Sequence, residues 1–285
     1  MCEDAHWADG ITCGTVADAM TGQAVRASCV VLSVEGSLAR LRLVRPEARN
    51  AINDEMVRGL AVGLDQLERS GARCLLLSAE GEHFTVGGDL DDLAATVDRL
   101  PHELAEVMPA YHDVLLRLDA LELPVVCAAQ GVVAGGGLGL LWVCDVVIAA
   151  ADLRLATGFA GLGLSGDGGS SWALPRLIGE RRARALMLAG RKLDAQVALE
   201  WGLVDRVVER ERLEAEAEAQ AASLARGPSI AFAHIKRLLR ASRGNRLPDQ
   251  LAAEQAAMIE CAGTEDARVG ILGFAEHRRP EFQGG

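Results

Sequence analysis

Several features that would place this chain in a common functional class are missing from its sequence. Lys and Arg number 29 against 40 Asp and Glu, which gives a formal net charge of −11. Such an acidic chain is poorly suited to nucleic acid or an anionic membrane surface as its main partner. No apolar run is long enough to span a bilayer. The nucleotide-binding patterns GxxxxGKS and GxxxxGKT, the zinc-binding pattern HExxH and paired Cys/His spacings are also missing, so we expect no metal ion.

The seven cysteines are scattered and form no CxxC pair. Cys74, Cys127 and Cys144 lie in apolar runs, where a thiol acts as a small core side chain. An odd, unclustered set without a secretory segment predicts a reducing, cytoplasmic location. Half of the residues are apolar, which is enough to bury a substantial core in 285 residues.

Strand-like and helical segments alternate along the first two thirds of the chain. Strands are expected at 74–78, 125–129 and 146–150, and Asn53 is placed to cap a helix that runs to about Glu68. This interleaving predicts an α/β protein with a partly parallel sheet. Past Arg181 the pattern becomes almost entirely helical. The expected parts are a poorly ordered or peripheral extension over 1–27, an α/β core over 28–205 and a helical region over 206–285.

Two glycine-rich turns are the most informative features of the chain. Gly135, Gly136 and Gly137 stand between the strand expected at 125–129 and a helix-compatible run, and Gly87 and Gly88 follow the strand expected at 74–78. Bare backbone in such turns approaches a ligand closely, and the following helix directs its free N–H groups at it. The N–H groups of Gly88 and Gly136 could bind one carbonyl oxygen together. That is the oxyanion-hole arrangement, which suits reactions through an enolate or tetrahedral anion.

Together with further motifs, these turns make the chain resemble the crotonase (enoyl-CoA hydratase/isomerase) superfamily from about Val30 to Phe282. The motifs that carry the resemblance are 43–52, 84–90, 124–137, Cys144-Asp145, 174–179 and 198–204. The resemblance implies a ClpP/crotonase-like spiral of β-β-α repeats with a helical C-terminal trimerisation region, and trimers that often pair into hexamers. It also implies an acyl-CoA thioester substrate, with coenzyme A as part of that substrate and no permanently bound cofactor.

The acid/base residues of the true hydratases are absent. The resemblance places their two catalytic glutamates at Gly139 and Phe159, neither of which carries a proton. Each such proton transfer contributes about a hundred- to ten-thousand-fold to a rate, so ordinary hydration is not expected. Asp167, in a glycine-dense loop, is the alternative acid. It either caps the following helix or matches the acid of two subgroups without these glutamates: the ring-1,2-epoxyphenylacetyl-CoA isomerases and 4-chlorobenzoyl-CoA dehalogenase.

His112 bears on which of these two subgroups the chain matches. It is either an ordinary helix histidine, solvated or paired with a nearby acid, or the counterpart of the dehalogenase's hydrolytic base. Phe159 stands where the dehalogenase has a tryptophan, which favours the isomerase. We therefore expect double-bond or ring-epoxide isomerisation of an acyl-CoA, with Asp167 as acid/base and Gly88 and Gly136 as oxyanion donors. The alternatives are an aryl-CoA dehalogenase with nucleophile Asp167 and base His112, and a hydratase homologue that only binds CoA.

Contacts with the CoA ester are inferred mainly from the resemblance. Arg278 is expected to reach the ligand of a neighbouring subunit, where arginine can engage phosphate. The full set of expected binding residues is Arg45, Arg49, Val86, Gly87, Asp89, Leu90, Gly135, Phe159, Leu162, Trp172 and Arg278.

Overall fold

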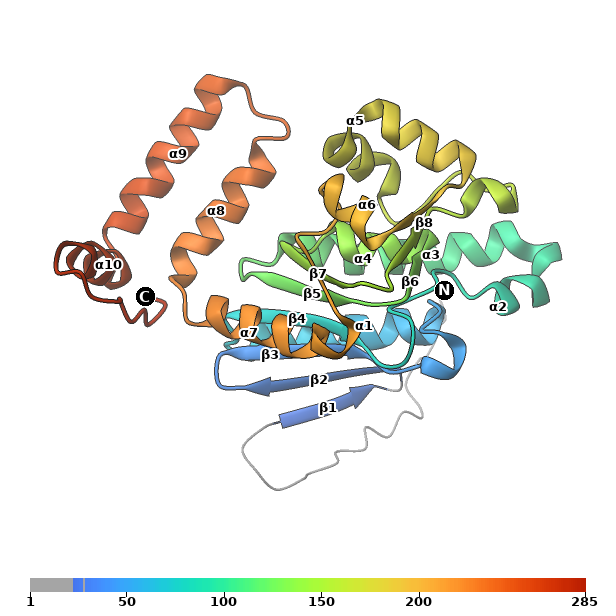
Figure 1. The fold of residues 1–285 in the computed structure, drawn as a ribbon, viewed down its shortest axis with the longest axis horizontal. Coiled ribbons are helices and arrows are strands. Elements are labelled where there is room, and N and C mark those ends of the chain that lie inside the picture. The colour runs from blue at the N-terminus through green and yellow to red at the C-terminus, as the bar shows by residue number, and fades with distance from the viewer. Residues whose placement is uncertain (1–22, 28) are drawn as a thin grey trace, which may run out of the picture.

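A seven-stranded sheet forms the centre of the computed structural model, which describes residues 23–27 and 29–285 (Figure 1). In order across the sheet, the strands are β1 (Gln23–Ala27), β2 (Val30–Glu35), β3 (Leu38–Leu43), β4 (Cys74–Ala79), β5 (Val125–Ala129), β7 (Val146–Ala150) and β10 (Arg206–Val208). The first three pair antiparallel, and β3, β4, β5, β7 and β10 pair parallel. The three predicted strands and the partly parallel sheet are confirmed.

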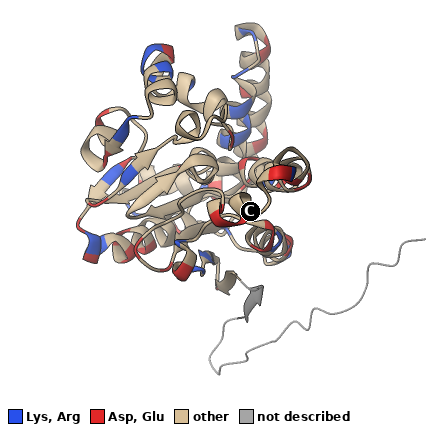
Figure 2. Cartoon of the chain, turned by 90° about the vertical axis from the view of Figure 1, so that its right-hand side faces the viewer, with Lys and Arg blue, Asp and Glu red and all other residues tan. Residues whose placement is uncertain are grey.

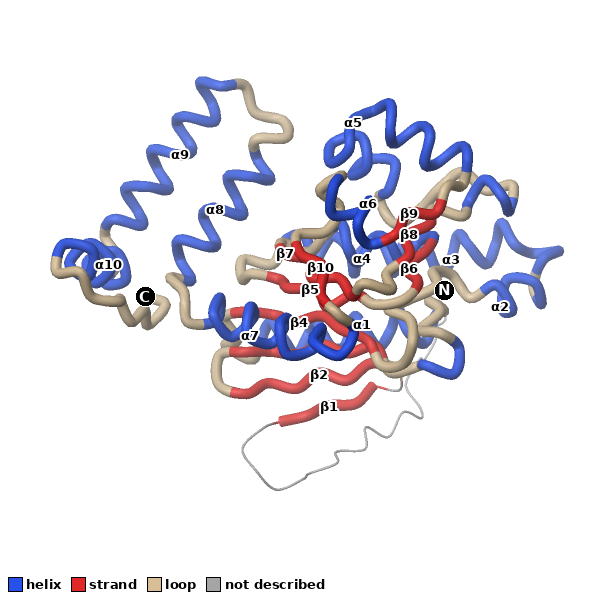
Figure 3. The backbone as a smooth tube through the Cα atoms, in the orientation of Figure 1, coloured by secondary structure: helices blue, strands red, loops and turns tan. Residues whose placement is uncertain are grey.

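A second, three-stranded sheet lies beside the first (Figure 3). Its strands are β6 (Val132–Ala134), β8 (Arg154–Ala156) and β9 (Lys192–Asp194). The chain alternates between the two sheets: β5 is followed by β6 and a helix, and β7 by β8 and a helix. Single bridges between Thr85 and Val133, and between Ile52 and Gly88, continue this alternation in the earlier repeats. This is the expected spiral of β-β-α repeats.

Ten α-helices surround the sheets in the described part of the chain. They are α1 (Asp54–Arg69), α2 (Leu90–Ala95), α3 (Leu100–Ala120), α4 (Leu138–Trp142), α5 (Ser170–Ala189), α6 (Ala195–Glu200), α7 (Leu213–Ala225), α8 (Ser229–Ala241), α9 (Leu247–Ala262) and α10 (Glu265–Ala275). The predicted cap is confirmed, because the Asn53 side chain accepts a hydrogen bond from the N–H of Met56 at 3.0 Å. Charged residues of both signs are spread along the helices (Figure 2).

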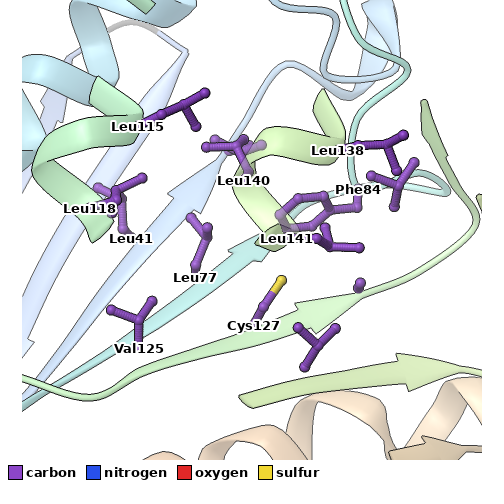
Figure 4. Packing of buried hydrophobic residues seen from close by; sticks show 14 of the residues in the cluster. Leu41, Leu77, Phe84, Leu115, Leu118, Val125, Cys127, Leu138, Leu140 and Leu141 are labelled. Carbon is purple, nitrogen blue, oxygen red and sulfur yellow. The ribbon is translucent and has the colours of Figure 1, made fainter. Parts of the chain in front are cut away.

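The main core lies between the large sheet and helices α1, α3 and α4. Leucines of α3 and α4 meet side chains of β3, β4 and β5 there, around the fully buried Phe84 (Figure 4). Helix α7 covers the opposite face of the sheet. Its inward residues include Ala217, Ala221 and Ala225, and these small side chains let the helix lie close to the strands.

The three expected parts have different boundaries in the structure. Gln23–Ala27, the end of the expected extension, is an edge strand of the sheet, and residues 1–22 lie outside the described residues. Strand β10 extends the sheet past position 205 before the helical region begins. Helices α8, α9 and α10 form an arm that projects from the core (Figure 1). None of the helices within the described residues is long and apolar enough to cross a membrane.

Candidate active site

The two glycine turns pack directly against each other. Gly87 has φ +87°, and a Cβ there would lie 2.5 Å from the carbonyl oxygen of Ala134. A Cβ on Gly137 would lie 2.5 Å from the Thr85 methyl group. Both positions therefore require glycine, since the neighbouring turn fills the space that a side chain would need. The sequence predicted two turns that act together, and the structure brings them into contact.

Two cavities of about 370 Å³ each meet beside these turns. The first, here called the acidic cavity, is lined by Asp54, Asp89, Asp92 and Glu103 among others. The second, the apolar cavity, is lined by residues that include Val86, Leu90, Gly135, Phe159, Leu162 and Leu164. Six residues line both cavities and so mark their junction: Gly88, Leu93, Leu104, Met108, Gly136 and Asp167.

The backbone N–H groups at the junction are available to a ligand. Within the described residues, the Gly88 N–H donates no hydrogen bond to another protein group, because the bridge to Ile52 uses the Gly87 carbonyl and the Asp89 N–H instead. Gly136 lies in a 3-10 turn over Gly135–Gly137, whose first N–H groups have no partner within the helix.

Asp167 faces the second glycine turn. A Cβ on Gly136 would lie 3.2 Å from one carboxylate oxygen of Asp167, and a Cβ on Gly168 would lie 2.4 Å from the Gly136 carbonyl oxygen. The loop is thus pressed onto the turn. The alternative that Asp167 caps the next helix is wrong, because the N-cap of α5 is Gly169 and no side chain caps it.

The other carboxylate oxygen of Asp167 is bound by His112. The Nε2 atom of His112 lies 2.6 Å from Oδ1 of Asp167, across 55 positions of sequence. Asp167 is 23% exposed and His112 is 45% exposed, so the pair stands at the edge of the cavity junction, not in the core. His112 is therefore paired with an acid, and that acid is the candidate catalytic residue. This arrangement leaves Oδ2 of Asp167 facing the junction.

Tyr111 is a site residue that the sequence did not identify. Its hydroxyl donates a hydrogen bond of 2.8 Å to the Gly136 carbonyl oxygen and so fixes the orientation of the peptide at the second turn. Burial raises the pKa of Tyr111 far above its ordinary value, and the charge of Asp167 acts in the same direction, so the hydroxyl stays a donor. The available signal was weak: Tyr111 is the one tyrosine of the chain and precedes His112.

The two positions of the missing glutamates differ in the space around them. A Cβ on Gly139 would lie 2.8 Å from the carbonyl oxygen of Gly168 and 2.8 Å from a methyl carbon of Leu115. Gly139 therefore has no room for any side chain. Phe159 is buried and its ring forms part of the apolar cavity wall.

The structure distributes the expected binding residues unequally. Val86, Leu90, Gly135, Phe159 and Leu162 line the apolar cavity, and Asp89 lines the acidic one. Gly87 lies in the first turn, where it contacts the second. Their predicted contacts with the CoA ester stay predictions, although the cavity walls are where such contacts would form.

Arg45 and Asp89 form an ion pair with each other. Their N···O distance is 2.7 Å, and Arg45 also donates to the Ala51 carbonyl. The Asp89 side chain in addition accepts from N–H groups at the start of α2. Burial alone would raise the pKa of Asp89, but the hydrogen bond from Arg45 and the backbone N–H groups outweigh it and hold that pKa below its ordinary value. Through these contacts, the Arg45 and Asp89 side chains join the segment before α1 to the start of α2.

Five expected binding residues line neither cavity: Arg45 and Gly87, described above, and Arg49, Trp172 and Arg278. Arg49 is exposed, beside the 3-10 turn over Pro46–Ala48. Trp172 stacks with Arg176 and Arg243 instead. Arg278 pairs with Glu276 and follows α10, a helix that lies at the opposite end of the molecule from α2 (Figure 1). Within one chain, none of Arg49, Trp172 and Arg278 lines a cavity.

The cavity walls formed by α2 and α3 were also missed by sequence reasoning. Leu93, Leu104 and Met108 line both cavities. Their apolar side chains are spaced as on any amphipathic helix, a pattern that predicts burial without telling a core from a substrate pocket.

The fold and this site define a crotonase-type α/β enzyme, and comparison with known proteins agrees. The enoyl-CoA hydratase/isomerase family matches residues 33–285, and the chain belongs to that family, which acts on acyl-CoA thioesters. It is 37% identical to the 1,2-epoxyphenylacetyl-CoA isomerase of Escherichia coli (strain K12), over 90% of this chain and 98% of the relative.

Other similar proteins carry hydratase names. The chain is 38% identical to a "probable enoyl-CoA hydratase" of Rhodobacter capsulatus, over 88% of this chain and 96% of the relative. A solved enoyl-CoA hydratase structure from Polaromonas sp. JS666 superposes with a TM-score of 0.85 at 30% identity, covering 89% of this chain and 99% of that one. The predicted family and fold are confirmed, and the relatives include both isomerase and hydratase names.

Proposed function

We propose that the protein isomerises an acyl-CoA thioester, moving a double bond or opening a ring epoxide through an enolate. The observation that carries this proposal is the position of Asp167, the one carboxylate among the described residues that lines both cavities. In the double-bond reaction, Asp167 takes a proton from the carbon next to the thioester carbonyl. The electron pair moves onto the carbonyl oxygen, and Asp167 returns the proton to a carbon further along the acyl chain.

The glycine turns supply the electrostatic part of the mechanism. The Gly88 and Gly136 N–H groups would donate to the enolate oxygen, and each such donor contributes about 2.7–4 kcal/mol of transition-state stabilisation. Hydration would need a second acid/base group to activate water and protonate carbon. Gly139 has no room for one and Phe159 is apolar, which supports isomerisation over hydration.

The contact between His112 and Asp167 favours one second candidate, aryl-CoA dehalogenation. There, Oδ2 of Asp167 would attack the ring carbon, halide would leave, and His112 would activate the water that hydrolyses the aryl ester. The same contact also serves an isomerase, because it fixes the carboxylate in one orientation. Phe159 in the apolar cavity lacks the N–H donor of a tryptophan, so we retain isomerisation as the first proposal.

We also propose that the arm of α8, α9 and α10 forms the contacts of a trimer or a dimer of trimers. Large apolar side chains are exposed along it: Ile235, Leu239, Leu247, Leu251, Met258, Ile259, Ile271 and Phe274. An exposed set of this size is typical of a surface that a partner covers. A neighbouring subunit could then bring Arg278 to a CoA ligand.

A substrate panel in heavy water tests the proposed activity. The panel contains a 2-enoyl-CoA, a 3-enoyl-CoA, a ring-epoxide phenylacetyl-CoA and a 4-chlorobenzoyl-CoA, analysed by mass spectrometry. Isomerisation with deuterium uptake supports the first proposal, whereas halide release supports the second. Gain of one water across an enoyl double bond as the main product would overturn both, and no turnover or exchange of any thioester would leave only a CoA-binding role.

The variant Asp167→Asn shows whether the carboxylate is the acid/base. It should lose about a hundred- to ten-thousand-fold in kcat, because the amide cannot accept the substrate proton. Binding of the CoA ester should change little, since Asn preserves the shape and keeps an acceptor for His112. Retained turnover would rule out Asp167 as the catalyst.

A further inference from the structure

The loop that carries Asp167 packs against Gly136, but it is rich in glycine, and this packing does not by itself fix the Asp167 side chain. Gly166 and Gly168 flank it with φ values of +144° and +62°, and Gly169 follows with φ +71°. Because glycine has no Cβ, it adopts these and other backbone conformations at little energetic cost. Beyond the contact of Gly168 with Gly136, the carboxylate is held by contacts at its own atoms and at the helix that begins just after it.

Two tryptophans fix the start of that helix. Trp142 of α4 donates from Nε1 to the hydroxyl of the fully buried Ser170 at 3.1 Å. Trp172, in the first turn of α5, has the Arg243 guanidinium carbon 4.5 Å from its ring centroid. Arg176 stacks on the same ring at 4.3 Å and donates to the Trp172 carbonyl. At these distances a guanidinium is attracted to the indole by a cation–π interaction.

Arg243 also reaches the helix that carries His112. It follows the C-terminal end of α8, and its Nη1 lies 3.5 Å from Oδ1 of Asp119 in the last turn of α3. Arg240, one turn earlier, donates to the Asp119 carbonyl. One guanidinium thus joins α3, which carries His112, to α5, which begins beside Asp167. Arg243 itself belongs to the arm and lines neither cavity.

We propose that Arg243 is a positioning residue, which clamps α3 to α5 and thereby keeps Asp167 paired with His112 and opposite the glycine turns. The inference rests on the proposed function, in which Asp167 moves the proton. It also makes catalysis depend on the packing of the arm. A displacement of about 1 Å at a reacting group can cost about a hundredfold in rate, so a change at Arg243 should appear in kcat even though the residue touches no substrate.

The test compares Arg243→Gln and Arg243→Lys with the matched control Arg246→Gln. The Arg246 side chain lies on the same arm and, among the residues that the structure describes, pairs only with Asp249. Arg243→Gln should lower kcat about ten- to a hundredfold with KM changed less than about threefold, and should alter the pH profile of kcat. Arg243→Lys, which keeps the charge, should recover part of the loss. Arg246→Gln should behave like the wild type.

Trp172→Leu provides an independent measure of the same clamp. If the ring and the guanidinium act together, Trp172→Leu combined with Arg243→Gln should be no slower than the slower single variant, since paired residues are not additive. Deuterium exchange next to the thioester of a saturated acyl-CoA gives a rate that does not require the physiological substrate. Circular dichroism melting identifies any variant that simply fails to fold.

The outcomes separate this inference from the proposed function. A normal kcat and pH profile in Arg243→Gln, with Asp167→Asn inactive, would overturn the clamp and leave the function standing. A lower melting temperature with unchanged kcat per folded site would also overturn it, because the role would then be structural alone. Full activity or exchange in Asp167→Asn, or none in the wild type, would overturn both.

Discussion

Introducing a side chain at Gly139 is the sharpest test of how tightly this site is built. The space there is closed by backbone: a Cβ would lie 2.8 Å from the Gly168 carbonyl oxygen and 3.0 Å from its Cα. Leu115 could rotate away, but Gly168 can move only together with Asp167. Overpacking of this kind costs about 1–3 kcal/mol. In a protein of this size each kcal/mol lowers the melting temperature by about 2–4 °C.

Gly139→Ala should therefore melt several degrees below the wild type and lose about tenfold or more in kcat, because Asp167 is displaced. Gly139→Glu introduces a glutamate at the position where the resemblance to the hydratases implies one. It should nevertheless gain no hydratase activity, since its carboxylate would be forced against Gly168. The matched control is Gly161→Ala, where a Cβ meets nothing within 4 Å and φ is not positive. Melting curves and mass-resolved turnover measure both effects. If Gly139→Ala behaves like the control, or Gly139→Glu hydrates an enoyl-CoA, the steric reasoning is refuted.

Three further predictions follow from other parts of the structure. An acyl group that ends in a carboxylate should bind the acidic cavity poorly, because like charges repel. Asp92→Asn should therefore lower the KM of such an acyl-CoA relative to the KM of an uncharged acyl-CoA of equal length. The same ratio of the two KM values in the wild type and in the variant would contradict this. Met258→Glu, on the exposed face of the arm, should shift the protein to a smaller species in light scattering, and an unchanged mass would argue against the arm as the assembly surface. Because folding lowers the pKa of Asp89, its ionised carboxylate stabilises the folded state at pH values above its unfolded-state pKa of about 3.9. This contribution to the free energy of unfolding should be lost as the pH falls through the lower, folded-state pKa. Denaturant titrations at several pH values should show a weaker loss in Arg45→Gln, which removes the ion pair.

Local chemistry made much of the fold predictable. Asn53 caps α1 because its side chain accepts a hydrogen bond from a free N–H in the first turn, and this preference depends on the residue type alone. The strands at 125–129 and 146–150 were visible as short apolar runs between helical segments. Glycines at Gly87 and Gly136 marked backbone that approaches something closely, and the structure shows that the turns also approach each other.

The alternatives at the site were decided by contacts that no local pattern contains. The sequence offered Asp167 as a helix cap or as an acid, and His112 as an ordinary or a catalytic histidine; the packing of α3 against the loop before α5 joined the two at 2.6 Å. Other contacts that no local pattern contains pair Arg45 with Asp89 and Trp172 with Arg243.

Local sequence patterns thus predict the strands at 74–78, 125–129 and 146–150, the start of α1 and the two glycine turns, because these depend on side chains a few positions apart. The carboxylate that faces the turns, the side chain that holds it and the location of the cavities follow from tertiary packing alone. These depend on segments as far apart as His112 and Asp167, whose meeting is set by how whole helices pack on the sheet.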